Sequence, residues 1–441
     1  LHTAYRRQRQ MCIRDRNYYE HALYNHILAS QDPDMPGCVT YYTSLLPGSF
    51  KQYSTPFDSF WCCVGTGMEN HSKYAESIYF KDNQELLVNL YIPSRLHWKE
   101  KGLKLTLDTR FPESDTVTVR MDEIGSYTGT LLFRYPDWVS GDAVVRINGE
   151  PAQTEAHKGS YIRLLDSVKS GDVITLVFTR NLYIDYAKDE PHFGSVMYGP
   201  ILLAGGLGTD DMPEDRVIDN RACRESLPAK NIPMLVGPLT DLDSWIQCSS
   251  QHPLRFTVKN GGGQQGVGLV PYFQMHHQRH TVYWKLYSPD EFVYRTRSLT
   301  DEVEIGDEKD ERKHALQGEN DSIYWHDYFW AKNTRFRMAK DGWFSYTLHI
   351  NKTEQKPYHL ICRFWGDEPD TCQFDILIDG NYLRTVSLNR KLYLTYVDDV
   401  YSIPADWTRG KDKVNVTFRA AQGKNAGGLY ELKITSDTNY R

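Results

Sequence analysis

The fold class is decided by residues 103–121, LKLTLDTRFPESDTVTVRM, in which apolar side chains occupy every second position on both sides of a Pro-containing turn. A period of two is typical of β-strands with one buried face. Segments with the same alternation surround this one: ELLVNLYI, GTLLFRYP, AVVRING, SYIRLLD and DVITLVFT. Short alternating segments at regular spacing predict an antiparallel β-sandwich. Asn148-Gly149 predicts a two-residue hairpin turn of type I′.

The strand pattern continues toward the C-terminus and predicts three β regions. The first covers 84–208 and includes the strand-like run 195–208, and the second is a small accessory region over 209–300. The acidic run 301–311, DEVEIGDEKDE, is typical of a solvated linker. A C-terminal sandwich follows within 301–441, with a hairpin at Asp379-Gly380.

The N-terminal part has a helical pattern instead. Residues 1–16 carry five arginines without hydrophobic periodicity, and we expect a non-native or disordered tail there. Residues 17–31 have a helical stripe at Tyr19, Leu23, Ile27 and Leu28. A strand is expected over 39–46, and a helix from Thr66, where Thr66 and Glu69 fit a capping box. Two helices cannot bury both apolar stripes, so 17–83 is interpreted as the C-terminal remnant of a helical domain.

Composition limits the classes of partner. The 441 residues carry a formal net charge of −6, which argues against nucleic acid. No apolar run approaches the ~18 residues of a membrane span. Eight irregularly spaced cysteines form no disulfide framework, and the compartment is left open.

The paired cysteines Cys62-Cys63 are the feature that points to chemistry. They are either an inert, buried pair or a pair of activated thiolates. The second reading is favoured because a helix follows directly, and its N-terminal amides and dipole stabilise thiolate over thiol. Thiolates are strong zinc ligands, yet two of them cannot close a tetrahedral site.

The segments PGSFKQYSTPFDS and FWCCVGTGMENHSKYAESIYF together resemble the signature of the β-L-arabinofuranosidase-like glycoside hydrolases, families 127 and 146. Downstream, LVPYFQMHHQRHTVYWKLY and HALQGEN resemble accessory domains of large bacterial members. The resemblance covers 17–441. It implies the last helices of an (α/α)6 barrel followed by two or more antiparallel β-sandwiches, a mainly-β chain.

The resemblance also implies site residues. In these families three cysteines and a glutamate hold Zn²⁺, and the first cysteine of the pair is also the nucleophile of a retaining reaction. Cys62 is therefore the expected nucleophile and zinc ligand, and Cys63 the expected second ligand. The family's remaining ligands and its general acid lie upstream of the pair. We therefore expect this chain to be truncated within the catalytic domain, with an incomplete zinc site, and inactive alone.

Other polar residues receive weaker assignments. Trp61 and Tyr41 (with its neighbour Tyr42) are either sugar-stacking or core residues, and His71 faces either the sugar pocket or the protein. Glu20 is expected at the surface. Glu69 is either a carboxylate near the site or, as we favour, part of the capping box, and Cys38 does not match the family's upstream ligand. Two histidine pairs are not expected to bind metal: His21 and His26, five residues apart, and His276 and His277, in a strand-like context.

The resulting expectation is a retaining zinc-thiolate glycosidase fragment acting on β-L-arabinofuranosides of plant glycans. Its partner is a plant-derived oligo- or polysaccharide, with no nucleic acid and no membrane, and the oligomeric state is open. Full-length bacterial relatives are expected in the periplasm or outside the cell. The alternative is a non-catalytic carbohydrate-binding or structural accessory module, with 301–441 as the binding domain.

Overall fold

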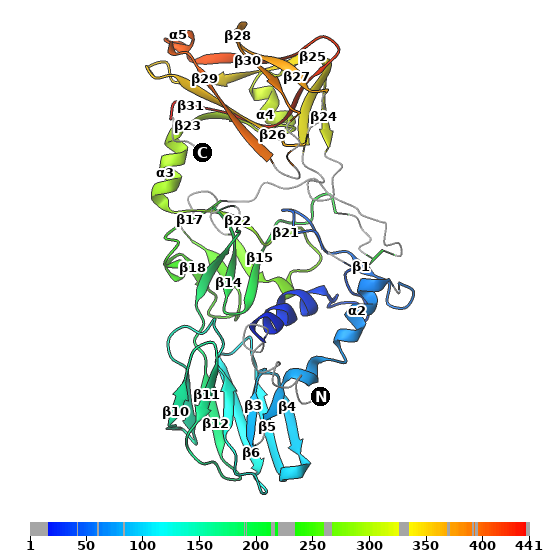
Figure 1. Ribbon diagram of the computed structural model, residues 1–441, viewed down its shortest axis with the longest axis vertical. Coiled ribbons are helices and arrows are strands. Elements are labelled where there is room, and N and C mark those ends of the chain that lie inside the picture. Colours follow the sequence, from blue (N-terminus) through cyan, green and yellow to red (C-terminus); the bar gives the residue numbers. More distant parts are fainter. Residues whose placement is uncertain are drawn as a thin grey trace. The chain divides into compact units, whose positions relative to one another are not determined.

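The computed structural model divides the chain into two compact units, Leu1–Ser288 and Pro289–Arg441, shown in Figure 1. It describes residues 16–41, 43–59, 61–82, 84–188, 190, 192–212, 217–218, 234–259, 267–325, 335–367, 371–389, 392 and 396–437. Residues 1–15 of the expected tail lie outside this set. The predicted mainly-β class is confirmed, whereas the described residues show no α/α barrel. No described helix has the length and apolar character needed to cross a membrane.

The first unit contains two sheets that pack face to face. One has the order β10-β11-β7-β3-β2, with strands Thr154–Ala156, Tyr161–Leu164, Leu131–Arg134, Glu85–Val88 and Tyr79–Asp82. The other has the order β4-β5-β6-β12-β8-β9, with strands Ser94–Trp98, Leu103–Thr109, Thr116–Glu123, Val173–Val177, Val144–Ile147 and Glu150–Pro151. Side chains from both sheets form one buried cluster, among them Leu105, Val119, Phe133 and Ile162. The alternation read in 103–121 is therefore the inward face of a sandwich.

The predicted hairpin turn at Asn148-Gly149 is confirmed. Ile147 pairs with Glu150, and both turn residues have positive φ, +52° and +89°. Asn and Gly adopt this left-handed backbone at the lowest cost, which is why the dipeptide marks type I′ turns.

A third sheet in the first unit corrects the assignment of 195–208 to the sandwich. The strands β14 (Phe193–Tyr198) and β15 (Ile201–Gly206) pair with each other and with later strands. The rest of this sheet consists of β13 (Leu182–Tyr186), β17 (Met234–Val236), β18 (Ile246–Cys248), β19 (Phe256–Val258), β20 (Gly268–Pro271), β21 (His280–Thr281) and β22 (Trp284–Tyr287). A Cβ on Gly205 would lie 2.3 Å from the Trp284 ring, so β15 needs glycine there. This packing is long-range and has no local sequence signal.

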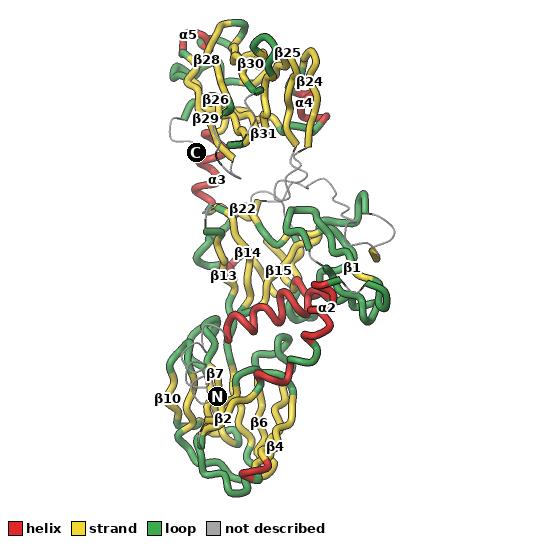
Figure 2. The backbone as a smooth tube through the Cα atoms, turned by 45° about the vertical axis from the view of Figure 1, so that its right-hand side comes forward, coloured by secondary structure: helices red, strands yellow, loops and turns green. Residues whose placement is uncertain are grey.

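The N-terminal helix lies against the third sheet, beside β15 in Figure 2. It is α-helical over 16–22, a π-helix at η1 (Leu23–Ile27) and a 3-10 helix at η2 (Leu28–Ser30). The side chain of Asn25 bonds both Pro200 O and Leu202 N, each at 2.8 Å. This polar anchor turns Asn25 inward and leaves Leu28, part of the expected apolar stripe, 38% exposed. The predicted helix is present, but its buried face differs.

Three further expectations in the N-terminal part are wrong. Glu20 is 2% exposed rather than a surface residue, because Arg134 and Trp138 bind its carboxylate. The strand over 39–46 is reduced, among its described residues, to isolated bridges at Val39 and Thr40. Arg16, assigned to the tail, is buried with its guanidinium over the Phe80 and Tyr161 rings.

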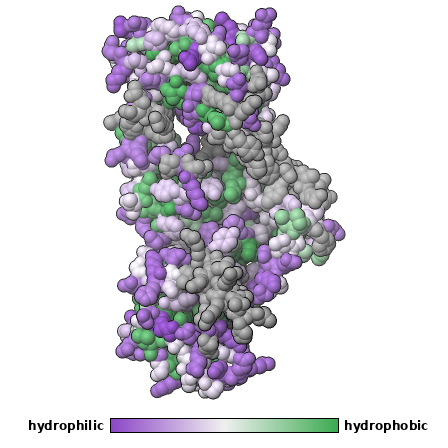
Figure 3. All heavy atoms as spheres, viewed as in Figure 1, coloured by the Kyte–Doolittle hydropathy of each residue, from purple (hydrophilic) through white to green (hydrophobic). Residues whose placement is uncertain are grey.

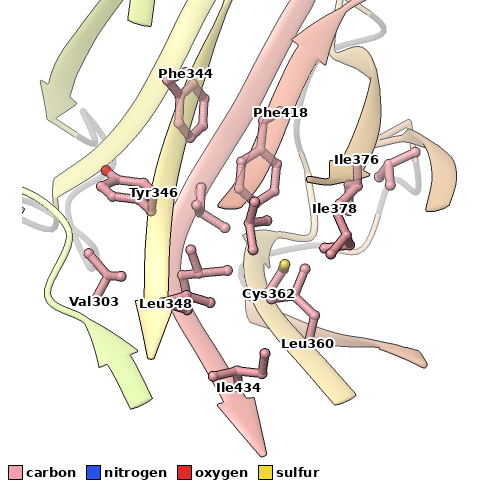
Figure 4. Packing of buried hydrophobic residues seen from close by; sticks show 14 of the residues in the cluster. Val303, Phe344, Tyr346, Leu348, Leu360, Cys362, Ile376, Ile378, Phe418 and Ile434 are labelled. Atoms are coloured by element: carbon pink, nitrogen blue, oxygen red, sulfur yellow. The ribbon is translucent and has the colours of Figure 1, made fainter. Parts of the chain in front are cut away.

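The second unit, Pro289–Arg441, is built on a nine-stranded sheet around its own core. Its strands are β23 (Leu299–Val303), β24 (Gln317–Trp325), β25 (Arg335–His349), β26 (Tyr358–Trp365), β27 (Gln373–Ile378), β28 (Asn381–Ser387), β29 (Tyr396–Ile403), β30 (Lys413–Ala420) and β31 (Asn425–Thr435). Figure 4 shows Phe344, Leu348, Cys362, Ile376 and Phe418 pointing into that core. The predicted hairpin at Asp379-Gly380 is confirmed, with φ of +48° and +82° and Ile378 paired to Asn381.

The acidic run 301–311 is not a solvated linker. Its first residues belong to β23, and Asp307 caps the helix α4 (Glu308–Lys313) by accepting bonds from Lys309 N and Asp310 N. Glu311 is 3% exposed and binds Arg337 and Tyr346. The partner of Glu311 lies 26 residues away, and acidic density alone does not reveal it.

The remaining helical segments are short. They are α2 (Cys62–Asn70), η3 (Tyr74–Ser77), η4 (Lys99–Lys101), η5 (Leu242–Ser244), η6 (Tyr272–Gln274), α3 (Pro289–Ser298) and α5 (Ala405–Thr408). Two more strands, β1 (Tyr53–Ser54) and β16 (Val217–Ile218), pair in parallel. On the face shown in Figure 3, hydrophilic atoms dominate the coloured surface, with smaller hydrophobic groups between them.

Candidate active site

The helix α2 begins at the paired cysteines themselves. Trp61 is its N-cap, with an extended backbone, and the first helical bond runs from Gly65 N to Trp61 O at 2.8 Å. The predicted capping box is therefore wrong: Thr66 lies inside the helix and donates its hydroxyl to Cys62 O at 3.1 Å. Glu69 is exposed on the same helix. Because the cysteines lie in the first turn, both thiols are closer to the positive end of the helix dipole than they would be if the helix began at Thr66.

The two sulfurs are exposed and lie close together. Cys62 Sγ is 4.0 Å from Cys63 Sγ and 3.2 Å from the Tyr41 hydroxyl. The Tyr41 and Trp61 rings meet edge to face with centroids 5.8 Å apart. The fold thus gathers Tyr41, Trp61, Cys62 and Cys63 at one helix end, although Tyr41 is separated from Cys62 by 21 residues. Tyr42 lies outside the described residues.

The pair has an internal order of deprotonation. The Tyr41 hydroxyl, and after it the Cys63 thiol, hydrogen-bond the Cys62 sulfur and hold the pKa of Cys62 below its ordinary value. Partial burial, and after it the neighbouring Cys62, raise the pKa of Cys63. The first proton is therefore lost from Cys62, and the Tyr41 hydroxyl donates to the resulting thiolate.

This order predicts selective alkylation. Cys62 should react with iodoacetamide faster than Cys63, and its rate should rise at lower pH than that of an ordinary thiol, because the thiolate is the reacting form. Tyr41→Phe removes the first cause of the shift and should move the pH–rate curve of Cys62 upward. Peptide mass spectrometry over a pH series measures both sites in one sample. Equal curves for Cys62 in the two proteins would contradict the role of Tyr41.

His71 is not brought to the sulfurs. It follows the last turn of α2, and a rise of about 1.5 Å per residue places it about 13 Å along the axis from Cys62. Its ring packs edge to face against Tyr74, with centroids 5.4 Å apart. Of the three expected sugar-binding residues, Trp61 and Tyr41 lie next to the thiols and His71 does not.

The separation of the two sulfurs suits donors that share one zinc ion. A tetrahedral site with Zn–S distances of about 2.3 Å sets two sulfurs about 3.8 Å apart, close to the 4.0 Å observed. Cys62 and Cys63 therefore fit as two donors to one ion. Among the described residues, no other His, Cys, Asp or Glu brings a ligand atom within 4.8 Å of both sulfurs.

The two histidine pairs that are not expected to bind metal have surroundings that the sequence does not predict. His277 lies in a loop after η6, not in a strand; its Nε2 is 3.0 Å from Asp32 Oδ1 and 3.5 Å from Asp34 Oδ2. Within the described part of the chain, this is the one group of three potential metal ligands. The His21 and His26 rings lie 6.0 Å apart, because the π-helical turn places residues five apart on one face. Neither the loop nor the π-helical turn has a clear signal in sequence.

Comparison with known families matches both sides of the cysteine pair. Residues 13–76 match the model of the β-L-arabinofuranosidase GH127 catalytic domain, and 85–180 match that of the GH127 middle domain. Residues 183–286 match a domain of unknown function, and 296–435 match a second family of unknown function. None of the curated proteins matches the chain.

Glycoside hydrolases are among the solved structures that are similar to this chain. One is described as a glycoside hydrolase, with 19% identity and a TM-score of 0.46 over 62% of this chain and 49% of that one. A GH127 β-arabinofuranosidase has 17% identity and a TM-score of 0.44 over 62% and 47%. A GH127 β-L-arabinofuranosidase from Geobacillus stearothermophilus T6 has 18% identity and a TM-score of 0.42 over 62% and 46%. The chain spans about half the length of these proteins.

The two family matches define the class of protein. The segment with the paired cysteines at the start of α2 falls in the match to the GH127 catalytic domain, and the sandwich that follows falls in the match to the GH127 middle domain. Over residues 13–76 and 85–180 the chain is GH127-like, similar to the catalytic and middle domains of that family.

Proposed function

We propose that this chain carries the nucleophile end of a retaining zinc-thiolate glycoside hydrolase that acts on β-L-arabinofuranosides of plant glycans. The observation that supports this most is the exposed Cys62 sulfur at the start of α2, with the Tyr41 hydroxyl 3.2 Å away. An accessible sulfur with a lowered pKa is suited to attack an anomeric carbon.

In this mechanism Cys62 and its neighbours have distinct tasks. The Cys62 sulfur attacks the anomeric carbon, and the bond to the leaving oxygen breaks as the glycosyl–sulfur bond forms. The Tyr41 hydroxyl donates to the sulfur before the attack and orients it. Water then cleaves the thioether and returns the thiolate, which gives retention by two inversions. The Trp61 ring, held edge to face by Tyr41, provides an apolar surface beside the sulfur for the sugar.

Zinc is part of the proposal. Cys62 and Cys63 would hold Zn²⁺, which keeps both sulfurs ionised and fixed in position. The described residues supply two donors, and a closed tetrahedral site needs four. The resemblance implies a general acid that lies upstream of the cysteine pair, and we infer that no carboxylate beside the Cys62 sulfur replaces it. We therefore expect no turnover of unactivated glycosides by this chain alone.

An activated substrate tests the proposal despite the missing acid. A nitrophenyl leaving group departs without protonation, so the chain with added Zn²⁺ should release nitrophenol from nitrophenyl β-L-arabinofuranoside. Release should stop near one equivalent per chain, because the same missing residue would activate water in the second step. If nitrophenol were released instead from the nitrophenyl β-D-xyloside or β-D-galactoside, the proposed substrate class would be wrong. Equal release by Cys62→Ser would refute the mechanism.

A second function is favoured by surface aromatics of the unit Pro289–Arg441. Tyr382 on β28 is 59% exposed, and Tyr396 on β29 is 36% exposed. These two strands contact each other, so both rings belong to one part of that unit. Exposed aromatic rings stack on sugar rings, and carbohydrate binding is therefore the second candidate for this unit.

A further inference from the structure

A cavity in the unit Leu1–Ser288 is distinct from the cysteine pair. Its volume is about 490 Å³, within the range of about 300–1,000 Å³ typical of small-molecule sites. Most of the wall comes from the N-terminal helix at His21, the segment after β7 at Asp137 and Trp138, and β13 with its preceding residue, at Tyr183 and Asn181. Lys158, between β10 and β11, and Pro200, between β14 and β15, complete it. Neither Cys62 nor Tyr41 is among its lining residues.

Several polar side chains on the wall have no partner among the described residues. The amide of Asn181, the ammonium group of Lys158 and the hydroxyl of Tyr183 form no hydrogen bond there, although all three line the cavity. Unsatisfied donors and acceptors on a concave wall are available to a ligand. By contrast, Asp137 binds the Asn17 amide, which sets its position.

The indole of Trp138 is held in position by its neighbours. Trp138 Nε1 donates to Glu20 Oε2 at 2.7 Å, and its ring stacks on Phe111 with centroids 5.6 Å apart. Glu20 is in turn fixed by the buried Arg134. Tyr183 presents a ring that is 36% exposed. The site is therefore built on preorganised groups, which lowers the entropy cost of binding.

The charge of the wall selects among ligand classes. The wall carries one carboxylate, Asp137, and one ammonium group, Lys158. Burial lowers the pKa of His21, and the nearby His26 lowers it further, so its imidazole is neutral at pH 7. A balanced wall disfavours anions and cations, and its many hydrogen-bonding groups disfavour a purely apolar ligand.

We propose that this cavity is a second saccharide site, which binds a neutral mono- or disaccharide between Trp138 and Tyr183 through Asn181, Asp137 and Lys158. Hydroxyl groups of a sugar complement a mixed set of amide, carboxylate and ammonium groups, and its C–H faces complement the rings. The site is non-catalytic and does not depend on the thiolate chemistry proposed above.

The test uses the full chain and direct binding. Saturation-transfer NMR with L-arabinose, D-xylose and D-galactose identifies the preferred sugar, and titration calorimetry with that sugar gives the affinity. Asn181→Ala and Tyr183→Ala should each weaken binding about tenfold, because each removes a ligand contact. Tyr183→Phe keeps the ring and should lose less. Thermal melts check that each variant is folded.

Two matched controls separate the outcomes. Cys62→Ser and Tyr382→Ala, at the thiolate pair and in the other unit, should leave the affinity unchanged. Loss of binding only in Cys62→Ser would overturn the cavity proposal while supporting the proposed function. Loss only in Tyr382→Ala would assign the sugar to the second unit. Absence of binding for all three sugars would overturn the proposal outright.

Discussion

Glu20→Ala should lower the free energy of unfolding of the unit Leu1–Ser288 by about 3–5 kcal/mol. Glu20 and Arg134 form an ion pair whose side chains are 3% and 1% exposed. Removing the carboxylate leaves the guanidinium buried with neutral partners only, Asn89 O at 2.6 Å and Asn17 Oδ1 at 2.9 Å. Trp138 Nε1 also loses its acceptor. An uncompensated buried charge is among the most destabilising consequences of a single substitution.

The effect is measured by urea unfolding followed by tryptophan fluorescence. The matched control is Glu123→Ala, which removes an exposed ion pair to Lys104 with side chains 58% and 42% exposed. It should cost less than about 1 kcal/mol. Glu20→Gln keeps an acceptor for Trp138, so its loss in free energy of unfolding should lie between those of Glu20→Ala and Glu123→Ala. A loss for Glu20→Ala no larger than the control would show that Arg134 regains water in the variant.

The strands of this fold are predictable because their signals are local. Alternation in 103–121 reports one buried face, and Asn148-Gly149 reports a left-handed two-residue turn; both hold in the structure. The third sheet is different, since β14 and β15 join strands from a later part of the chain. The alternating pattern of residues 195–208 does not identify the strands with which β14 and β15 pair.

The burial of a charged residue is not predictable from the sequence where its partner is distant along the chain. Glu20 lies on a helix with many polar neighbours, and Glu311 lies in an acidic run, so both resemble surface residues. Their partners are Arg134 and Arg337, separated from them by 114 and 26 residues. Burial of a charge depends on such long-range pairing, which a single sequence does not reveal.

The candidate site was predictable in its chemistry but not in its geometry. Adjacent cysteines before a helix indicated thiolates, and the structure moves them into the first turn of α2. The sequence leaves Tyr41 as either a sugar-stacking or a core residue, and it does not reveal that the Tyr41 hydroxyl contacts Cys62. The sequence leaves His71 facing either the sugar pocket or the protein, and the structure places it at the end of α2 opposite the cysteines, packed against Tyr74. Spacing on a helix is decisive only once the helix start is known.

The chemical claim is tested most directly by locating the sugar on the protein. The chain is incubated with Zn²⁺ and nitrophenyl β-L-arabinofuranoside, quenched with acid, digested and mapped by mass spectrometry. We expect one pentosyl adduct on Cys62, because the first step proceeds with an activated leaving group and the second lacks its base. Cys62→Ser should lose the adduct completely. Cys62→Ala, which cannot form any oxygen adduct, is the matched control.

Cys63→Ser distinguishes the nucleophile from a ligand. It should lower the yield by weakening the metal site and leave the adduct position unchanged. An adduct on an aspartate or glutamate, or undiminished labelling of Cys62→Ala, would contradict the assignment of Cys62 as the nucleophile. An unlabelled Cys62 that still alkylates at low pH would contradict it equally. One pentose on Cys62, absent from Cys62→Ala, is the result that the account predicts.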